Sequence, residues 1–588
     1  MPTTILEILD ATSRAQADRP AMARKRGGAW EKTTWREYRD AVRQAARALV
    51  ATGVEPGQGV VILAFNRPEW FVANLATIAA GGRPAGIYTN STPEQCRYIT
   101  EHAEAAVAVV ENRESLERLQ GAGGRPAGLK AIVLMDGEPA EPGVVTWKDF
   151  LARGTAAHDA EVERRTAAAR PDDVATLIYT SGTTGTPKGV MLTQRNLAFI
   201  AEKAQEILPI GPGDRLISYL PLSHIAEQVV SHLLSVATGA CVHFAESLEK
   251  LPENLREVRP HIFLGVPRVW EKIQAGMQAA GAQASPLRRR IAAWAKGVGL
   301  AGGYADQEGR PRPWSYGLAD RLAFSKVRAR LGFDDIRMLV VSAAPIAKET
   351  LDYFQSLALP IMEVYGMSEC TGPTTMSIPK RYRLGRAGYA IPGTELRIAE
   401  DGEVLIRGPH VFKGYYKNEE ATREALDADG WIHSGDVGEI DADGFLRVTD
   451  RKKELLITSG GKNIAPQHLE GKLKQIAAVS QAVAIGDRRP YVVALLTLDP
   501  LRVAAEAEKA GSPARTPGDA ARCPVFKAYL EKQVEQTNQG LARYEQVKKI
   551  ALVPQELSVE AGELTPTLKL KRRVILERHR DAIEALYA

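Results

Sequence analysis

The chain has 588 residues, of which 45% are hydrophobic and 25% charged, an ordinary composition for a soluble globular protein. Its 76 Lys and Arg nearly balance 71 Asp and Glu, which argues against nucleic acid as a partner. Four scattered cysteines form no CxxC pair, which argues against a disulfide scaffold or a Cys-based zinc site and suits a reducing compartment such as the cytoplasm. No signal peptide is visible at the N-terminus, and no apolar run approaches the ~18 residues that span a bilayer.

The first 170 residues alternate helical and strand patterns. Residues 33–54 have helical spacing and meet a glycine near their end, and the apolar run 60–65 predicts a strand. A helix is expected through PEWFVANLATIAAG, and the strands AGIYTN and AVAVVE continue the rhythm. This βαβ alternation predicts a parallel sheet covered by helices.

The most informative stretch is residues 179–189, which read YTSGTTGTPKG after a predicted buried strand at 172–178. Glycines let a backbone approach a ligand closely, so successive N–H groups and hydroxyls can surround a polyphosphate. Lys188 would add a mobile positive charge. A Walker A loop ends in Gly-Lys-Ser/Thr, whereas here Pro187 precedes Lys188 and Gly189 follows it.

A second α/β cycle follows the loop, and the pattern changes twice more. Its short apolar strands are LISYL, CVHFA, HIFLGV, RMLVVS and IMEVYG. Residues 285–314 are rich in Arg and Gly and predict an inserted helix with a loop. From Gly393 onward, short strands and turns indicate a small β subdomain. After Asp450 strands and helices mix again, so we place a domain boundary there.

Two further motifs carry groups suited to a nucleotide. In EVYGMSECTGPTT, Tyr365 could stack on a base and Glu369 could hold Mg²⁺ through oxygen. In residues 431–470, Asp436 could accept hydrogen bonds from ribose hydroxyls. Arg451, fifteen residues later, could reach the same sugar or the phosphates.

Together these strings resemble the adenylate-forming enzymes, and the resemblance covers roughly the whole chain in order. The strings SYLPLSHIAEQ, GVPRVWEKI, GELTPTLKLKRR and ILERHRDAIEALY most resemble the bubblegum type of long-chain acyl-CoA synthetase. Many adenylate formers carry Pro-x-Gly-Lys near the C-terminus, whereas this chain has Leu568 in place of the glycine before Lys569. Lys571 is therefore the alternative candidate for the catalytic lysine.

The resemblance implies an α/β fold with two domains. A large N-terminal domain (1–449) would contain two helix-covered sheets and a β subdomain, and a small mobile α+β domain (450–588) would follow. Asp450 would be the hinge. ATP would be bound by Thr180, Ser181, Gly182, Thr183, Thr184, Gly185, Lys188, Tyr365, Gly366, Met367, Ser368, Asp436, Arg451 and Lys453.

The resemblance also assigns the remaining roles. Mg²⁺ would be held by Thr180 and Glu369. Lys569 and His224 would be catalytic, with His224 near the substrate carboxylate. CoA would be bound by Gly460, Gly461 and Lys462.

The implied activity is that of an ATP-dependent long-chain fatty acid–CoA ligase. It would form acyl-AMP and pyrophosphate and then acyl-CoA and AMP. Two alternatives stay open: a ligase that passes the acyl group to a carrier protein, and a non-catalytic nucleotide-binding protein. Arg288, Arg289 and Arg290 lie beside Ile291 and Trp294, a pattern that also suits peripheral contact with an anionic membrane, although an ordinary charged helix would look the same. Acyl chain length and oligomeric state are not evident from the sequence.

Overall fold

The computed structural model describes residues 4–139, 141–180, 186–459, 462–559, 561–565 and 569–588. Its largest sheet has eight strands in the order β19-β9-β8-β4-β3-β5-β6-β7. The strands are β3 (Gly59–Leu63), β4 (Arg83–Gly86), β5 (Ala105–Val110), β6 (Ala131–Leu134), β7 (Val144–Thr146), β8 (Val174–Thr180), β9 (Lys188–Thr193) and β19 (Gly414–Tyr415). The strands from β8 to β7 are parallel, which confirms the predicted βαβ alternation.

One edge of this sheet is antiparallel and was not predicted. Strand β9 returns alongside β8, and β19 pairs antiparallel with β9. In this register Thr180 lies opposite Lys188, so both ends of the predicted phosphate loop are fixed by a strand.

The helices of this region begin where the sequence favours capping. They are α1 (Ile5–Ala15), α2 (Trp35–Ala51), α3 (Pro68–Ala79), α4 (Pro93–His102), α5 (Arg113–Gln120), α6 (Trp147–Ala152) and α7 (Asp159–Ala168), with 3₁₀ turns η1 (Gly121–Gly123) and η2 (Ala156–His158). At the start of α2, the Thr34 side chain accepts a hydrogen bond from the Glu37 N–H, and the Glu37 carboxylate accepts one from the Thr34 N–H. This capping box satisfies N–H groups that the first turn leaves unpaired. The predicted helix at 33–54 is thus confirmed.

A second layer is built from two sheets that continue one another. One has the order β10-β11-β1-β2 and the other β12-β13-β14-β15-β16. Their strands are β1 (Pro20–Arg26), β2 (Ala29–Thr34), β10 (Arg215–Ser218), β11 (Cys241–Phe244), β12 (Ile262–Gly265), β13 (Met338–Val341), β14 (Ile361–Met367), β15 (Gly372–Met376) and β16 (Tyr389–Ala390). The two sheets meet where the His261 N–H donates to the Arg215 carbonyl and the Arg215 N–H donates to His261 Nδ1. With this junction, the prediction of two helix-covered sheets agrees with the structure.

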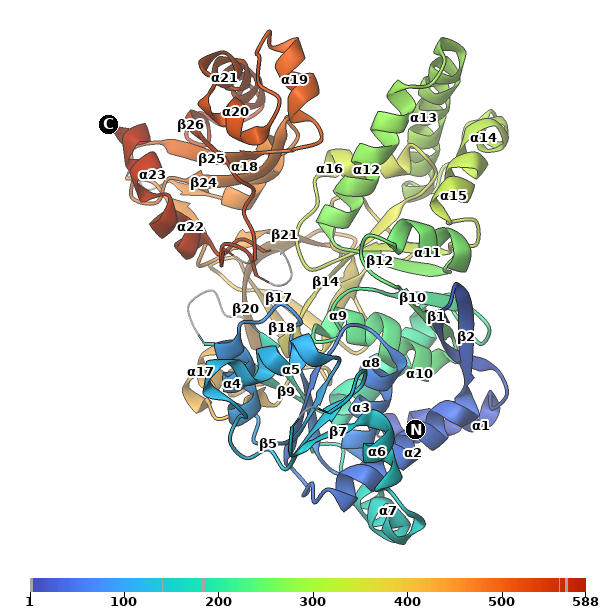
Figure 1. The fold of residues 1–588 in the computed structure, drawn as a ribbon. Coiled ribbons are helices and arrows are strands. Elements are labelled where there is room, and N and C mark those ends of the chain that lie inside the picture. Colours follow the sequence, from blue (N-terminus) through green and yellow to red (C-terminus); the bar gives the residue numbers. More distant parts are fainter. Residues whose placement is uncertain (1–3, 140, 181–185, 460–461, 560, 566–568) are drawn as a thin grey trace.

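The helices around this layer include the predicted insertion. They are α8 (Gln194–Ile207), α9 (Ile225–Glu227), α10 (Leu234–Thr238), α11 (Leu251–Val258), α12 (Pro267–Ala282), α13 (Pro286–Gln307), α14 (Tyr316–Ala319), α15 (Ser325–Leu331) and α16 (Lys348–Gln355). Two π-helical segments, η3 (Gln228–Leu233) and η4 (Asp320–Phe324), and the 3₁₀ turn η5 (Ser368–Cys370) complete the set. In Figure 1, α12 and α13 project from the body together with α14.

The chain then forms the expected β subdomain and a final α+β part. The subdomain contains β17 (Glu395–Ile398), β18 (Glu403–Arg407), β20 (Ile432–Ile440) and β21 (Leu446–Arg451), all antiparallel, with α17 (Glu419–Ala425). The last part contains β22 (Leu456–Ile457), β23 (Asn463–Ile464), β24 (Val479–Ile485), β25 (Val492–Leu498) and β26 (Val547–Val553). Its helices are α18 (Pro466–Leu473), α19 (Val503–Lys509), α20 (Pro517–Arg522), α21 (Pro524–Asn538), α22 (Arg572–Arg578) and α23 (Arg580–Tyr587).

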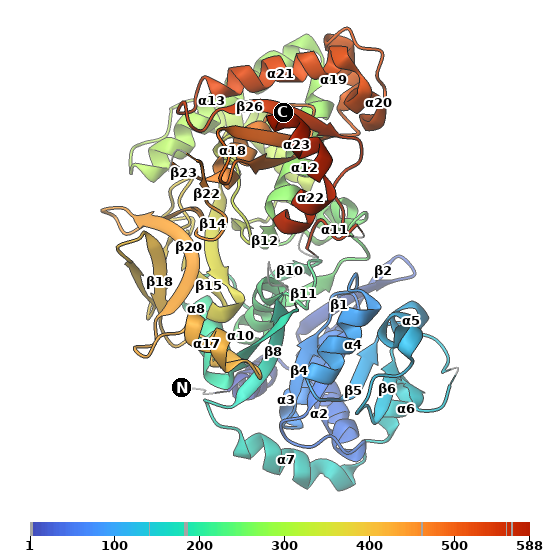
Figure 2. The same cartoon turned by 90° about the vertical axis from the view of Figure 1, so that its left-hand side faces the viewer.

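The C-terminal part buries its own hydrophobic residues. One cluster, from Leu456 to Ile550, lies between the sheet and α18–α21, and a second, from Val483 to Leu586, lies under α22 and α23. In the part of the chain that the structure describes, neither cluster contains a residue from the large core of the first 446 residues. Figures 1 and 2 show this part, in orange and red, at one end of the molecule. No helix among the described residues combines the length and apolar character that crossing a membrane requires.

Candidate active site

A cleft of about 2550 Å³ lies between the C-terminal part and the rest of the chain. Its walls come from the ends of β8 and β14, from β20 and β21, and from the segment that precedes α22. Because these elements meet only in the folded chain, the cleft collects motifs that are nearly 400 residues apart in sequence.

The two ends of the phosphate loop open into this cleft. Thr180 closes β8 and Lys188 begins β9, and both side chains line the cavity. Lys188 Nζ lies 4.8 Å from the centre of the Tyr415 ring, a cation–π contact that holds the ammonium beside the cleft. The loop residues Ser181, Gly182, Thr183, Thr184 and Gly185 lie outside the described residues.

Strand β14 delivers the second motif to the same place. Tyr365, Gly366, Met367, Ser368 and Glu369 all line the cleft. Gly366 has no room for a side chain, because a β-carbon there would collide with the carbonyl of Gly372 on β15. The tight pairing of β14 and β15 therefore requires glycine at this position. Tyr415 Oη donates a hydrogen bond to Glu369 Oε1 across 2.8 Å.

Asp436 and Arg451 are neighbours because of strand register. They lie opposite each other on β20 and β21, and Arg451 Nε donates to Asp436 Oδ1 at 3.1 Å. Tyr365 Oη donates to Asp436 Oδ2 at 2.7 Å. Burial, and after it the Asp436 charge, shifts the pKa of Tyr365 well above its usual value, which keeps this phenol a hydrogen-bond donor. The arrangement places a carboxylate and a guanidinium on one wall of the cleft.

Lys569 reaches this charged cluster from the C-terminal part. Its backbone is held by Thr565, whose hydroxyl accepts the Lys569 N–H at 3.0 Å and whose own N–H donates to the Lys569 carbonyl. The side chain lines the cleft, as does that of Lys571. Lys569 is exposed within the cleft; partial loss of hydration there, followed by the charge of Arg451, lowers its pKa, whereas Asp436 and Glu369 act in the opposite direction. Residues 566–568, which include Leu568, lie outside the described residues.

His224 lies across the cleft at the start of α9. Its Nδ1 accepts a hydrogen bond from the Ala226 N–H at 3.1 Å, so this nitrogen carries no proton. Burial, and then the positive charge of Lys569, lowers the pKa of His224 to about 4. His224 is therefore neutral at physiological pH with its proton on Nε2, and it lines the cleft.

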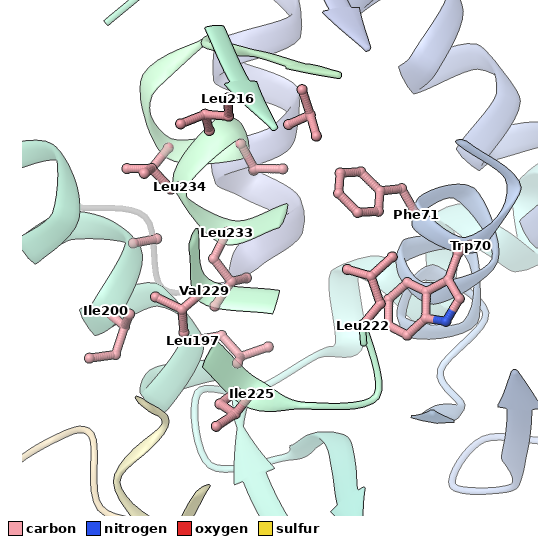
Figure 3. Packing of buried hydrophobic residues seen from close by; sticks show 14 of the residues in the cluster. Trp70, Phe71, Leu197, Ile200, Leu216, Leu222, Ile225, Val229, Leu233 and Leu234 are labelled. Carbon is pink, nitrogen blue, oxygen red and sulfur yellow. The ribbon is translucent and has the colours of Figure 1, made fainter. Parts of the chain in front are cut away.

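An apolar arm of the cleft runs between α8 and η3. Figure 3 shows Ile200 of α8 close to Val229 of η3, with Ile225 beside them. The cleft-lining apolar side chains here are Ile200, Ala204, Ile207, Leu208, Ile225, Val229, Val230 and Leu234. Such a surface suits a hydrocarbon chain, because burial of apolar area contributes about 25 cal/mol per Å².

The predicted hinge residue Asp450 lies at the cleft, whereas the predicted CoA residue Lys462 does not. Asp450 lines the cleft and is buried; burial raises the pKa of its carboxyl to about 6, although the N–H groups of Arg451 and Gln467 donate to it. Lys453 is exposed and also lines the cleft. Lys462 lies outside it, with Nζ 6.0 Å from the Tyr544 ring centre. Gly460 and Gly461 lie outside the described residues.

Comparison with known sequences identifies the family. A family model described as "AMP-binding enzyme" matches residues 9–416, and one described as "AMP-binding enzyme C-terminal domain" matches residues 453–588. The chain belongs to the AMP-binding enzyme family.

This AMP-binding enzyme has similar relatives along its whole length. The long-chain-fatty-acid–CoA ligase ACSBG2 of Xenopus laevis is 39% identical, with 100% of this chain and 84% of the relative covered. The long-chain-fatty-acid–CoA ligase ACSBG1 of Bos taurus is 36% identical, with 100% and 85% covered. The predicted family, including its bubblegum type, is thus confirmed.

Solved structures show the same fold. The adenylation domain of a carboxylate reductase from Mycobacterium chelonae superposes with a TM-score of 0.78 at 22% identity, covering 99% of this chain and 91% of that chain. The anthranilate CoA ligase AuaEII, solved in complex with anthranoyl-AMP, superposes with a TM-score of 0.75 at 20% identity, covering 100% and 99%. At this identity the likeness supports the fold alone.

Tyr415 is a residue of the AMP-binding enzyme's cleft that sequence reasoning missed. Tyr415 contacts both Lys188 and Glu369, two residues from separate motifs. The sequence feature that could have indicated Tyr415 is the aromatic pair in KGYYK. By itself this string looks like an ordinary edge strand, and only the pairing of β19 with β9 places Tyr415 at the cleft.

The residues of the cleft can be compared with those that a Mg²⁺ site requires. Among the described residues, no group of three or more His, Cys, Asp or Glu is placed to hold a metal ion. Mg²⁺ is usually held by one or two carboxylates together with substrate phosphates, so Glu369 beside the ends of the phosphate loop fits such a site.

Proposed function

We propose that this AMP-binding enzyme is a long-chain fatty acid–CoA ligase that forms AMP. One observation carries the proposal: Lys188, Asp436 and Lys569, from three distant segments, line a single cleft that also has an apolar arm. The full-length similarity to ligases named for long-chain fatty acids and CoA supports the same substrates.

In the first half-reaction, a fatty carboxylate oxygen attacks the α-phosphorus of ATP and pyrophosphate leaves. Asp436 accepts hydrogen bonds from the ribose hydroxyls, and Arg451 orients both the sugar and Asp436. Lys188 and the hydroxyls of the phosphate loop hold the departing phosphates. Lys569 offsets the negative charge that develops at the α-phosphate, which is the kind of electrostatic stabilisation on which phosphoryl-type transfer depends.

His224 positions the fatty acid for this attack. Since it is neutral and its Nδ1 is an acceptor, Nε2–H can donate to the substrate carboxylate without neutralising the attacking oxygen. The hydrocarbon chain would occupy the apolar arm between α8 and η3.

Mg²⁺ is the proposed metal, with Glu369 and Thr180 as its protein ligands. When bound, it would neutralise part of the phosphate charge. Tyr415, which donates to Glu369, would hold that carboxylate in place.

In the second half-reaction, the CoA thiol attacks the acyl carbon and AMP leaves. We propose that residues 450–588 form a mobile domain that turns about Asp450, removes Lys569 from the cleft and brings in Gly460, Gly461 and Lys462. Two observations support mobility. Among the described residues, the C-terminal part shares no hydrophobic cluster with the rest of the chain. It meets α12 and α16 through partly exposed ion pairs such as Lys474–Glu271 at 3.1 Å and Lys472–Glu349 at 3.4 Å. Exposed pairs of this kind contribute only about 0–1 kcal/mol each.

A single turnover assay with a series of fatty acids tests the function. We expect fatty-acid-dependent pyrophosphate release, CoA-dependent acyl-CoA formation, and a preference for long chains. Transfer to a carrier protein but not to CoA would favour the acyl-adenylate ligase alternative. Absence of pyrophosphate release with every acid would identify a non-catalytic nucleotide-binding protein.

A further inference from the structure

We propose that the outer surface of α13, α14 and η4 docks on an anionic lipid bilayer, from which the enzyme takes its fatty acid. We call this surface the basic face; it is formed by the exposed residues Leu287, Arg288, Arg289, Arg290 and Trp294 of α13 together with Trp314, Leu318, Arg321 and Leu322. The proposal rests on the proposed function, because only an apolar substrate needs such a source.

Large apolar side chains are unusually exposed on this face. Trp314 is 94% exposed, Leu287 68%, Leu318 50%, and Trp294 and Leu322 39% each. These five are nearly half of the large hydrophobic residues found exposed in the described chain, although they fall within 36 consecutive residues. Such clustering marks interaction surfaces, whereas single exposed apolar residues need no explanation.

Helical spacing places one of the three arginines, Arg290, on the same side of α13 as two exposed apolar residues. Leu287, Arg290 and Trp294 are three and four residues apart on α13, so they share one face. Leu318 and Leu322 are four residues apart, and Arg321 lies beside Leu322. Arginine stems can lie along the acyl region while their guanidinium groups meet lipid phosphates, and Trp favours the same interface.

The opposite sides of these helices are already occupied. Ala295 of α13 packs with Ala319 and Phe324, which are nearly or fully inaccessible, in a small cluster of their own. Gly299 and Gly302 of α13 have no room for a side chain, because a β-carbon would collide with Ser356 or Tyr316. The segment is therefore a firmly packed unit, and Figure 1 shows α13 and α14 at the periphery of the molecule.

Charge identifies the partner. Residues 285–331 contain ten Lys or Arg against three Asp or Glu, whereas the whole chain has a net charge of only +5. The rest of the chain therefore carries a slight negative excess. All three acidic residues form ion pairs within the segment: Asp306 with Arg312, Asp320 with Arg328, and Glu308 with Arg310. Arg288, Arg289, Arg290 and Arg321 have no ion pair with a described residue, so their charge remains for an anionic surface.

The position of the face fits delivery of an apolar substrate. Helix α13 runs from the basic face to the cleft, and its last turn contributes Tyr304 and Gln307 to the cleft wall. A second copy of this chain is a poorer occupant, because two such basic surfaces would repel each other.

Co-sedimentation of the full chain with vesicles tests the proposal. The probes are vesicles of phosphatidylcholine with and without phosphatidylserine. The wild type should bind the anionic vesicles and lose binding as salt rises. Because each basic residue near such a surface contributes roughly a fivefold gain in affinity, the triple variant R288S/R289S/R290S should bind roughly a hundredfold more weakly. Quenching of Trp fluorescence by brominated lipid should be reduced in W294F/W314F.

A matched control removes the same charge elsewhere. Lys532, Lys548 and Lys549 are exposed in the C-terminal part, and their replacement by Ser should leave binding unchanged. Equal loss of vesicle binding in both triple variants, salt-insensitive binding or no binding would overturn the proposal. A wild-type dimer that the L318S/L322S variant converts to a monomer would overturn it too. Acyl-CoA formation from a water-soluble, shorter fatty acid is measured in parallel. Wild-type lipid binding without any acyl-CoA would contradict the proposed function and still support docking.

Discussion

Tyr415 donates a hydrogen bond to Glu369 Oε1 across 2.8 Å, and this contact joins the second motif to strand β19, 46 residues later in the chain. The same ring holds Lys188 from the phosphate loop. A carboxylate, a phenol and an ammonium are therefore assembled at one point of the cleft, where the magnesium and phosphates of ATP are proposed to bind.

Replacing Glu369 tests the proposed metal ligand. Glu369→Gln should raise the Mg²⁺ concentration needed for half-maximal activity by roughly 10–100-fold, because a neutral amide is a poorer ligand. Tyr415→Phe removes only the hydrogen bond to Glu369 and keeps the ring beside Lys188, so it should raise the requirement in the same direction but by less. Magnesium titrations of pyrophosphate release compare the three proteins. Equal half-saturation in Glu369→Gln and wild type would exclude the role.

Lys569 should matter in only one half of the reaction. Lys569→Ala should slow adenylate formation by ~10²–10³-fold and spare thioester formation from supplied acyl-adenylate, because its charge is needed only while the α-phosphate is attacked. Lys571→Ala, which alters a neighbouring cleft residue, should have a small effect on both. If Lys571→Ala slowed adenylate formation selectively and Lys569→Ala had a small effect, Lys571 would be the catalytic lysine.

The pH profile gives an independent test of Lys569. Partial desolvation in the cleft, then the nearby Arg451, lowers the pKa of Lys569 although its side chain is exposed, so it loses its proton at a lower pH than an ordinary lysine. Adenylate formation should therefore decline earlier on the alkaline side than thioester formation does. Rates of the two half-reactions measured across alkaline pH provide the comparison, and parallel profiles would contradict the assignment.

A proline at the proposed hinge should separate the two half-reactions. Proline fixes φ near roughly −65°, so Asp450→Pro should preserve one half-reaction and abolish the other. Asp450→Ala leaves the backbone free and should retain both. Circular dichroism of each variant checks folding. Equal loss of both half-reactions in a folded Asp450→Pro protein would mean that the hinge lies elsewhere.

A buried carboxyl beside His224 should make stability depend on pH. Glu227 is 1% exposed and accepts from Ser231 Oγ at 2.6 Å; burial raises its pKa to about 7. The folded state therefore holds this proton more tightly than the unfolded state. The associated stability is fully present below pH ~4.5 and is lost as pH rises toward ~7, by at most about 3 kcal/mol. Glu227→Gln, which cannot titrate, should show a smaller decrease between these pH values in urea denaturation; an identical decrease would contradict the assignment.

Much of the fold followed from local patterns. The helix at α2 was predictable because apolar spacing and the Thr34–Glu37 capping box agree, and the strands β3, β5 and β12–β14 because short apolar runs are bounded by turns. The antiparallel pairing of β9 with β8 was not predictable, because KGVMLT is equally compatible with the continuation of a loop. The junction of β10 with β12 depends on His261, a contact that no local pattern encodes.

The candidate site was predictable where family motifs carry it and not where tertiary pairing does. Asp436 and Arg451 were both identified, but their direct contact follows from the register of β20 and β21. Tyr415 was missed because its partners come from two other segments. The neutral state of His224 depends on burial and on Lys569, which lies 345 positions later in the chain.

Transfer of oxygen from the fatty acid tests the central claim most directly. The enzyme is supplied with ATP, CoA and a long-chain fatty acid labelled with ¹⁸O in both carboxylate oxygens, and the nucleotide products are examined by mass spectrometry. If the carboxylate attacks the α-phosphorus and the thiol then attacks the acyl carbon, each AMP must carry one ¹⁸O while acyl-CoA retains the other. Unlabelled AMP, or ADP with labelled inorganic phosphate, would contradict an acyl-adenylate mechanism.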